Sequence, residues 1–376
     1  MTTALALYSG GLDSTLACRV VMAQDIRVVA VKFVTPFFGA DLLERAGEYQ
    51  EDILRKFGIE LILRDLSEPY LKMLGRPAHG YGKNFNPCVD CKIMLMGEAL
   101  KMLPELGASF LVSGEVIGQR PMSQRRDTLR VIERDSGCGD LLLRPLCARH
   151  LPPTRPEREG LVDRERLLDF RGRNRTPQIE LARHFGISDY ESPSGGCVLT
   201  DPNLARRIRE HYLAAARRNQ TVAGEDVRLL LSGRIFRLPE GSLLALGRDE
   251  AENERLALRR QPGDWWLLLR DFPGPAAIMR PPSVPDADHS DGLAQISNKI
   301  KPGEVDTCLK ESEGGGFGGA ALAADLAAAA SLVLRYTSRS VRERGEAVVL
   351  ASGPGHDELP LPAFVADQEE IEAWRA

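Results

Sequence analysis

The stretch Ser9-Gly10-Gly11-Leu12-Asp13-Ser14 joins a short apolar segment, Ala4–Tyr8, to a segment with helical periodicity, Ser14–Gln24. A strand that turns through glycines into a helix directs backbone amides and a helix N-terminus at one point, where they bind anions such as phosphate. The two glycines let the backbone approach phosphate oxygens because they lack a Cβ. The serines can donate hydrogen bonds and the aspartate can hold Mg²⁺. The alternative is a plain turn in which the polar residues cap the helix.

The residues after this Ser9–Ser14 loop continue the alternation of strands and helices. Helical patterns, among them Leu42–Phe57 and Ile93–Leu103, separate three apolar segments: Val28–Phe33, Ile59–Leu63 and Phe110–Ser113. Such alternation predicts an α/β fold, a parallel twisted sheet with helices on both faces. The active site of such a sheet lies beyond the carboxyl ends of its strands.

The character of the sequence changes near Asn203, where a basic amphipathic helix begins. We therefore expect a first domain at 1–202 and a second, α+β domain at 203–376, with a mobile loop at about 281–319. Gly-containing turns separate short apolar segments of the second domain. Its expected strands are Val227–Leu231, Ile235–Leu238, Leu243–Leu246 and Ala347–Ala351, and its expected helix is Ala320–Tyr336.

The composition is that of a globular protein, with 43% hydrophobic and 27% charged residues and a net charge of -4. No apolar run approaches the roughly 18 residues of a membrane span, and the first residues lack the pattern of a secretory signal. We therefore expect a soluble cytoplasmic protein with no membrane partner. Basic surface is concentrated: Ile117–Arg183 contains fifteen arginines against ten acidic residues. Such a local excess is compatible with RNA binding or with a solvated helix face.

A Cys-x-x-Cys motif lies in Asn86–Lys92, directly before the helical pattern that starts at Ile93. A thiol at a helix N-terminus has a lowered pKa, so we expect the thiolates of Cys88 and Cys91 to be favoured. The chain has no second Cys-x-x-Cys, which argues against a four-cysteine zinc site. Cys197, next to a pair of glycines, is the candidate third ligand. A structural Cys-x-x-Cys with no sulfur chemistry is the alternative.

These motifs resemble those of a known family. The Ser9–Ser14 loop resembles the signature of the PP-loop ATP pyrophosphatases, and Asn86–Cys91 with Cys197 is similar to the cysteine motifs of tRNA 2-thiouridylases. The segment Ser113-Gly114-Glu115-Val116-Ile117-Gly118-Gln119 looks like a motif of tRNA 4-thiouridine synthetases. The resemblance implies that ATP with Mg²⁺ activates a uridine carbonyl, with Asp13, Cys91 and Cys197 as catalytic residues. It also implies that the loop, Gly114 and Gln119 bind ATP, and that Glu115 contacts ATP or the substrate.

Two sulfur chemistries remain open for the cysteines. In one, Cys197 receives a persulfide from a donor such as a cysteine desulfurase, and Cys91 or Cys88 resolves it as a disulfide. In the other, Cys88, Cys91 and Cys197 hold a 4Fe-4S cluster with one open iron.

The second half of the chain carries its own resemblance. Gly247–Leu256, the Gly-Asp-Trp-Trp run at 263–266 and the Pro-Gly turn at 273–274 resemble the RNA-binding domain of NFACT proteins. An exposed Trp beside arginines can stack on unpaired bases. Adjacent Trp265 and Trp266 on a strand face opposite ways, so one of them is a core residue. The expected contacts with tRNA or another RNA are Arg120, Arg125, Arg126, Arg173 and Trp265.

The sequence therefore favours an ATP-dependent tRNA uridine thiolase. Two alternatives are a PP-loop enzyme that acts on a small molecule and an RNA-binding adaptor without catalysis. The intact Ser9–Ser14 loop speaks against the adaptor.

Overall fold

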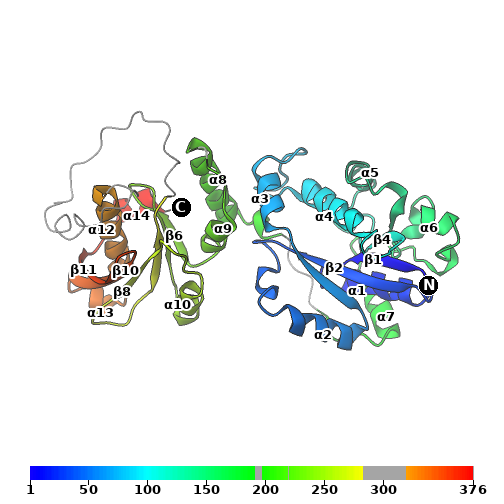
Figure 1. Cartoon of the computed structure of the whole chain (residues 1–376), viewed down its shortest axis with the longest axis horizontal. Helices are drawn as coiled ribbons and strands as arrows, with labels where there is room; N and C mark the ends of the chain where they lie inside the picture. The colour runs from blue at the N-terminus through cyan, green and yellow to red at the C-terminus, as the bar shows by residue number, and fades with distance from the viewer. Residues whose placement is uncertain (191–196, 219, 283–318, 376) are drawn as a thin grey trace. The chain divides into compact units, whose positions relative to one another are not determined.

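The computed structural model describes residues 1–190, 197–218, 220–282 and 319–375. The chain divides into two compact units, Met1–Ala205 and Arg206–Ala376, each with its own sheet (Figure 1). The loop expected at about 281–319 lies almost entirely outside the described residues.

A parallel sheet in the order β3-β2-β1-β4-β5 organises the described part of the first unit. At the carboxyl end of the central strand β1, Leu7 pairs with Val31 of β2 and with Ser113 of β4. The segments that follow these three strands therefore emerge side by side at one edge of the sheet. The α/β prediction is confirmed. The strands are β1 (Thr3–Leu7), β2 (Arg27–Val34), β3 (Glu60–Asp65), β4 (Phe110–Ser113) and β5 (Leu142–Leu143).

Helices cover both faces of this sheet because successive strand residues point in opposite directions. On β1, Ala4 and Ala6 join one core cluster, whereas Leu5 joins the other. Helices α1 (Leu12–Met22), α2 (Ala46–Phe57) and α7 (Thr176–His184) pack on the first face, and α4 (Cys88–Met102) and α5 (Arg126–Asp135) pack on the second (Figure 1). Two further helices are α3 (Ser67–Gly75) and α6 (Arg155–Arg158).

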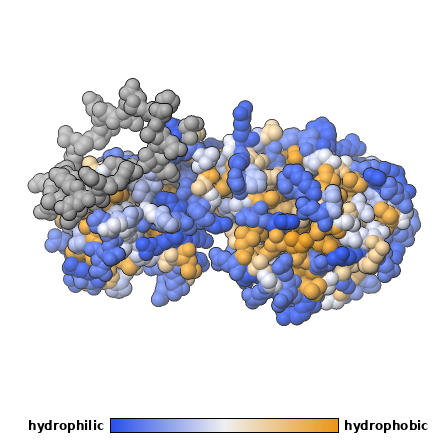
Figure 2. Space-filling view, viewed as in Figure 1, coloured by the Kyte–Doolittle hydropathy of each residue, from blue (hydrophilic) through white to orange (hydrophobic). Residues whose placement is uncertain are grey.

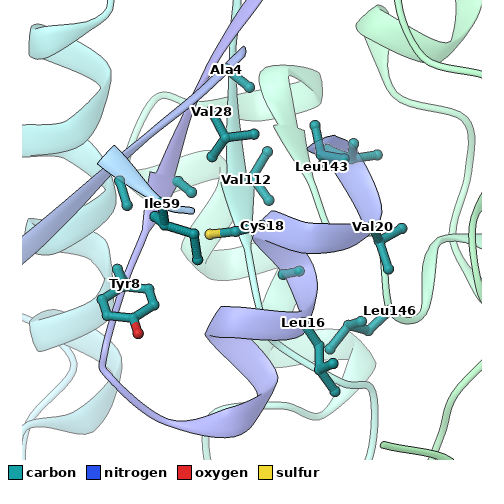
Figure 3. Packing of buried hydrophobic residues seen from close by; sticks show 14 of the residues in the cluster. Ala4, Tyr8, Leu16, Cys18, Val20, Val28, Ile59, Val112, Leu143 and Leu146 are labelled. Carbon is teal, nitrogen blue, oxygen red and sulfur yellow. The ribbon is translucent and has the colours of Figure 1, made fainter. Parts of the chain in front are cut away.

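The thiol of Cys18 lies inside the first of these clusters. Figure 3 shows Cys18 on α1 among Val28, Ile59 and Val112, and the residue has no exposed surface. Burial raises the pKa of the Cys18 thiol to about 12. Cys18 is therefore a core residue without thiolate chemistry.

The second unit contains an antiparallel sheet in the order β11-β10-β8-β9-β7-β6, as far as its residues are described. Helix α12 (Gly319–Arg335) packs on one face through Leu326, Ala330 and Val333. The strands are β6 (Arg234–Arg237), β7 (Leu243–Leu246), β8 (Trp265–Leu269), β9 (Ala277–Arg280), β10 (Glu346–Gly353) and β11 (His356–Phe364). The other helices are α8 (Pro202–Arg217), α9 (Gly224–Leu230), α10 (Glu250–Ala257), α13 (Arg339–Arg342) and α14 (Gln368–Trp374).

Two elements differ from the sequence prediction. Val227–Leu231, predicted as a strand, lies mostly in α9, because a short apolar run fits either structure and Glu225 and Asp226 favour a helix N-terminus. The predicted helix Leu42–Phe57 is shorter, since α2 begins at Ala46 after a 3-10 turn at Ala40–Leu42.

The surface of the first unit is not uniformly polar. Figure 2 shows a patch of apolar surface on this unit, at the place where β2 runs between α4 and α2 in the same view of Figure 1.

None of the helices in the described ranges combines the length and the apolar composition that crossing a membrane requires.

A buried carboxylate fixes α12 to the sheet of the second unit. Asp325 has no exposed surface and accepts hydrogen bonds from the amides of Glu240 and Ser242, both at 2.9 Å. Burial raises the pKa of this carboxyl group, although the hydrogen bonds oppose the shift. Asp325 therefore satisfies two amides at the turn between β6 and β7.

We predict that Asp325→Ala lowers the free energy of unfolding of the second unit by about 3 kcal/mol, because two buried amides lose their acceptor. Urea unfolding followed by tryptophan emission measures this unit alone, since Trp265, Trp266 and Trp374 are the only tryptophans and all lie in it. Exposed Asp357→Ala is the matched control. Equal stability of the two variants would contradict the assignment.

Candidate active site

The Ser9–Ser14 loop connects the carboxyl end of β1 to the N-terminus of α1. Its serines close the turn: the hydroxyl oxygens of Ser9 and Ser14 are 3.1 Å apart, and Ser14 Oγ donates to the carbonyl of Gly11 at 2.8 Å. The first amides of a helix have no partner within the helix. The turn therefore presents amides and a helix dipole at the sheet edge, as a phosphate site requires.

Two glycines hold this loop in place. Gly10 has a φ of +91°, and a Cβ there would lie 3.1 Å from Lys32 Nζ and 3.2 Å from the Tyr49 hydroxyl. Lys32, on β2, donates to the carbonyl of Ser9 at 2.5 Å. Gly114, after β4, is packed more tightly, because its Cβ would lie 2.6 Å from the backbone of Asp13 and Ser14. The strand β4 and the loop thus touch backbone to backbone.

The carboxylate of Asp13 faces polar groups from two other segments. Its Oδ2 accepts from Gln119 Nε2 at 2.8 Å and lies 3.5 Å from Arg175 Nη2. Its Oδ1 is buried and has no hydrogen-bond partner among the described residues, and the same holds for Gln119 Oε1 and Arg175 Nε. Buried polar atoms without partners are costly and mark places where a ligand supplies the partner. Asp13 thus keeps one oxygen available for a cation, and Arg175 keeps a donor.

The three candidate cysteines lie near one another. Cys88 and Cys91 occupy the first turn of α4, and Cys197 precedes the 3-10 turn Val198–Thr200. Two hydrogen bonds bring that turn to the segment before α4: Asn84 Nδ2 donates to the carbonyl of Thr200 at 2.7 Å, and the Phe85 amide donates to that of Leu199 at 3.3 Å. The charges of Cys88 and Cys197 both raise the pKa of Cys91, so the three thiols are within electrostatic reach.

The expectation that the helix N-terminus favours the thiolate of Cys91 is wrong. The pKa of Cys91 is raised to about 12, chiefly by burial and also by the charges of Cys88 and Cys197. Lys92 and a hydrogen bond from Tyr70 lower it, but less. Burial also raises the pKa of the Cys197 thiol. Desolvation is therefore the largest influence on the pKa of Cys91.

The described residues contain no group of three or more His, Cys, Asp or Glu side chains that is arranged to hold a metal ion. The 4Fe-4S cluster on Cys88, Cys91 and Cys197 therefore stays a prediction. The glycine pair before Cys197 lies outside the described residues.

A buried ion-pair network joins the segment after β4 to α4. Glu115 pairs with Lys92 and, at 2.9 Å, with Nε of Arg144, which also pairs with Glu133. Burial opposes ionisation of Glu115, but the two cations hold its pKa at about 2. Both carboxylate oxygens of Glu115 are paired within the protein, and its expected contact with ATP or substrate stays a prediction. Glu115 follows Gly114, which packs against the Ser9–Ser14 loop, and it pairs with Lys92, which is next to Cys91.

The predicted RNA contacts in the first unit differ in their surroundings. Arg120 and Arg173 are exposed. Arg125 pairs with Asp127 at 3.1 Å, and Arg126 donates to the carbonyl of His150 at 2.9 Å. Arg120 and Arg173 are thus the guanidinium groups most available to a ligand.

The prediction that Trp265 stacks on RNA bases is wrong. Its side chain is only 2% exposed and lies in the core against α12, where it leaves no room for a Cβ on Gly353. Trp266 points to the other face of β8, is partly exposed, and has the Arg260 guanidinium 5.7 Å from its ring centroid. Alternation along the strand places the two rings on opposite faces, and packing in the core with α12 buries Trp265.

Comparison with known proteins supports part of this reading. Residues 1–150 match the family model described as thiamine biosynthesis protein (ThiI). A probable tRNA sulfurtransferase of Thermococcus kodakarensis (strain ATCC BAA-918 / JCM 12380 / KOD1) is 28% identical over 137 residues, which make up 35% of this chain and 34% of the relative. The chain thus spans about a third of the length of this curated relative.

Two solved structures also match, at low similarity. The crystal structure of a 4-thiouridine synthetase–RNA complex with bound ATP has a TM-score of 0.34 and 21% identity, over 60% of this chain and 53% of that chain. A predicted subunit of tRNA methyltransferase from Methanocaldococcus jannaschii DSM has a TM-score of 0.33 and 12% identity, over 59% of this chain and 90% of that chain. Scores at this level support no inference about this chain.

Sequence reasoning missed Lys32, Tyr70 and Arg144. Lys32 interrupts the apolar strand Val28–Phe33, and Arg144 ends a run of three leucines. A charged residue inside an apolar run indicates a buried partner, so the sequence could have identified Lys32 and Arg144 as candidates. Tyr70 carries no such signal. Arg175 lies two residues from the predicted RNA contact Arg173, but it faces Asp13.

We predict that Gly114→Ala lowers ATP affinity at least tenfold without unfolding the unit, because the new Cβ displaces the backbone of Asp13 and Ser14. Calorimetric titration with ATP measures the loss. Gly47→Ala on α2 is the control, since a Cβ there meets nothing within 4 Å. Equal ATP affinity of both variants would show that the loop does not hold the nucleotide.

We predict that Glu115→Gln lowers the free energy of unfolding of the first unit by about 3–5 kcal/mol, because Lys92 loses its counter-charge and the buried Arg144 keeps only Glu133. The folded pKa of about 2 lies below the ordinary 4.5, so this stabilisation is present above pH 4.5 and is lost as the pH falls towards 2.

Hydrogen-exchange mass spectrometry of peptides from residues 1–205 between pH 6 and pH 3 measures the effect. The variant should lose part of the wild-type pH dependence on the acid side, whereas exposed Glu44→Gln should keep it. An unchanged acid slope in Glu115→Gln would overturn the assignment.

Proposed function

We propose that the first unit is an ATP-dependent sulfurtransferase that thiolates a uridine of tRNA. The observation that supports this best is the path of residues 113–119. Gly114 and Gln119 contact Asp13 of the phosphate loop, while Glu115 pairs with Lys92 beside Cys91. One short segment thus holds a nucleotide site and a group of thiols in a fixed relation, which a reaction between activated substrate and sulfur requires.

The first step is activation of the base. The carbonyl oxygen of the uridine attacks the α-phosphorus of ATP, and the bond to the β-phosphate breaks to release pyrophosphate. The helix N-terminus of the Ser9–Ser14 loop stabilises the negative charge on the phosphates. Asp13, through its unpartnered Oδ1, is the residue that would hold Mg²⁺, which supplies charge neutralisation when bound.

The second step transfers sulfur. A persulfide on Cys197, loaded by a donor such as a cysteine desulfurase, attacks the activated carbon with its terminal sulfur, and AMP leaves. The thiolate of Cys91 or Cys88 then attacks Cys197 Sγ, which breaks the bond to the transferred sulfur and forms a protein disulfide. Two electrons from a dithiol reductant restore both thiols. Lys92 and Tyr70, which lower the pKa of Cys91, favour the attacking thiolate.

A 4Fe-4S cluster is the other sulfur source considered. Cys88, Cys91 and Cys197 are the residues that would hold it. An iron count on anaerobically purified protein distinguishes the two sources.

The RNA would lie over the basic part of the first unit. Arg120 and Arg173 are exposed and suited to phosphate, which guanidinium groups bind through two parallel hydrogen bonds. We also propose an RNA-binding role for the second domain, 203–376, on the basis of its resemblance to the NFACT RNA-binding domain.

We predict that purified protein with ATP, Mg²⁺, tRNA transcript, cysteine desulfurase and ³⁵S-cysteine releases pyrophosphate and forms a labelled thiouridine. Nucleoside mass spectrometry identifies the product. Asp13→Asn should lose both activities because it disrupts activation, whereas Cys197→Ala should retain tRNA-dependent pyrophosphate release and lose only sulfur transfer.

Cys138→Ser is the control, since Cys138 is not one of the three candidate cysteines and its thiol is hydrogen-bonded to the Ser136 hydroxyl at 2.7 Å. Full labelling by Cys197→Ala, or pyrophosphate release that a small molecule but not tRNA stimulates, would refute the proposal.

A further inference from the structure

A small pocket in the second unit is lined by positively charged side chains. Its volume is about 50 Å³, and all its lining residues belong to Arg206–Ala376. The lining comes from α8, the segment after it, β6 and the end of β9. The polar lining includes His211, Arg218, Thr221, Asp226, Arg237 and Arg280.

The charges around this pocket are not balanced. Arg280 is neutralised by Asp264 at 2.8 Å and by Asp226 at 3.0 Å. Arg237 instead contacts the carbonyl of Gly241 and Nδ1 of His211, both at 3.2 Å. Asp264 and Asp226 are therefore paired with Arg280, and Arg237 forms no ion pair among the described residues.

A second guanidinium lies beside Arg237. Arg218 is half-buried directly over Gly241, which has a φ of +101° and no space for a Cβ beneath that guanidinium. Within the described ranges, no hydrogen bond from the Arg218 side chain is found. The charge of Arg218 lowers the pKa of Asp325, but the Asp325 carboxylate already accepts hydrogen bonds from two backbone amides. Gly241 is thus next to both guanidinium groups: its carbonyl accepts from Arg237, and Arg218 occupies the space that a Cβ would need.

This arrangement is electrostatically unfavourable without a ligand. Burial lowers the pKa of Arg237, and the charge of Arg218 lowers it further, with only partial compensation from Asp226 and Glu210. Two like charges at a partly desolvated site repel each other strongly. A bound anion removes that repulsion and accepts hydrogen bonds from both groups.

We propose that Arg218 and Arg237 form an oxyanion site that binds one backbone phosphate of the RNA substrate. The inference rests on the proposed function in that RNA is the ligand. The small volume suits a single tetrahedral group rather than a whole nucleotide. The exposed Thr221 hydroxyl at its edge can donate a further hydrogen bond. A phosphate contact of this kind positions the RNA without reading its sequence.

The test measures tRNA affinity of the full chain by fluorescence anisotropy over a series of KCl concentrations. Arg218→Gln is expected to weaken binding about tenfold and to reduce the slope of log affinity against log salt by about one. The control is Arg217→Gln, the same charge change at the adjacent exposed residue of α8, which does not line the pocket. Tryptophan emission verifies that the second unit is folded in both variants.

Three outcomes overturn the inference. Equal losses of affinity in Arg217→Gln and Arg218→Gln would mean that RNA binding depends only on the net charge around the end of α8. Wild-type affinity in Arg218→Gln would mean that the pocket does not contact RNA. If that variant binds RNA normally but no longer gains thermal stability from inorganic phosphate at matched ionic strength, the site takes a free oxyanion instead of RNA.

Pyrophosphate release separates this inference from the proposed function. With saturating tRNA, Arg218→Gln should still release pyrophosphate, because the pocket lies outside the unit that contains the Ser9–Ser14 loop. Normal RNA binding by Arg218→Gln together with intact thiolation would refute the phosphate site alone. Failure of the wild-type protein to bind tRNA would refute both.

Discussion

The close packing of Gly114 on the backbone of Asp13 and Ser14 is the constraint on which the candidate site depends. No side chain fits between these segments, since a Cβ on Gly114 would lie 2.6 Å from three backbone atoms. Strands β1 and β4 are neighbours in the sheet, so their following segments meet at its edge. This contact fixes the Ser9–Ser14 loop relative to the segment directly after β4, which includes Glu115 and Gln119.

The ion pairs of Glu115 extend that constraint to the cysteines. A carboxylate with almost no exposed surface is costly to bury, and Lys92 and Arg144 offset the cost. Because Lys92 adjoins Cys91, the same network positions the first turn of α4. It also holds a positive charge beside a thiol that burial keeps protonated. The chemistry of Cys91 is therefore set by opposing effects of desolvation and nearby charge.

Much of the fold could be read from the sequence, because apolar segments bounded by glycines alternate with helical patterns in the first 200 residues. Phe110–Ser113 and Leu243–Leu246 coincide with β4 and β7. Val227–Leu231 could not be assigned correctly, since five apolar or basic residues carry no clear period. Trp265 could not be distinguished from Trp266, because strand alternation states that they differ but not which faces the core.

The sequence by itself determined the strand–turn–helix loop at Ser9–Ser14, the parallel α/β architecture and the identity of the candidate thiols, because these depend on local residue type and spacing. Only the tertiary structure decided that Arg175 and Gln119 face Asp13. The same holds for the ion pair of Glu115 with Arg144 and for the position of Arg218 beside Arg237. These pairings join residues far apart in the chain. Burial, which sets their pKa values and the availability of each side chain, is a property of the packed fold and not of the local sequence.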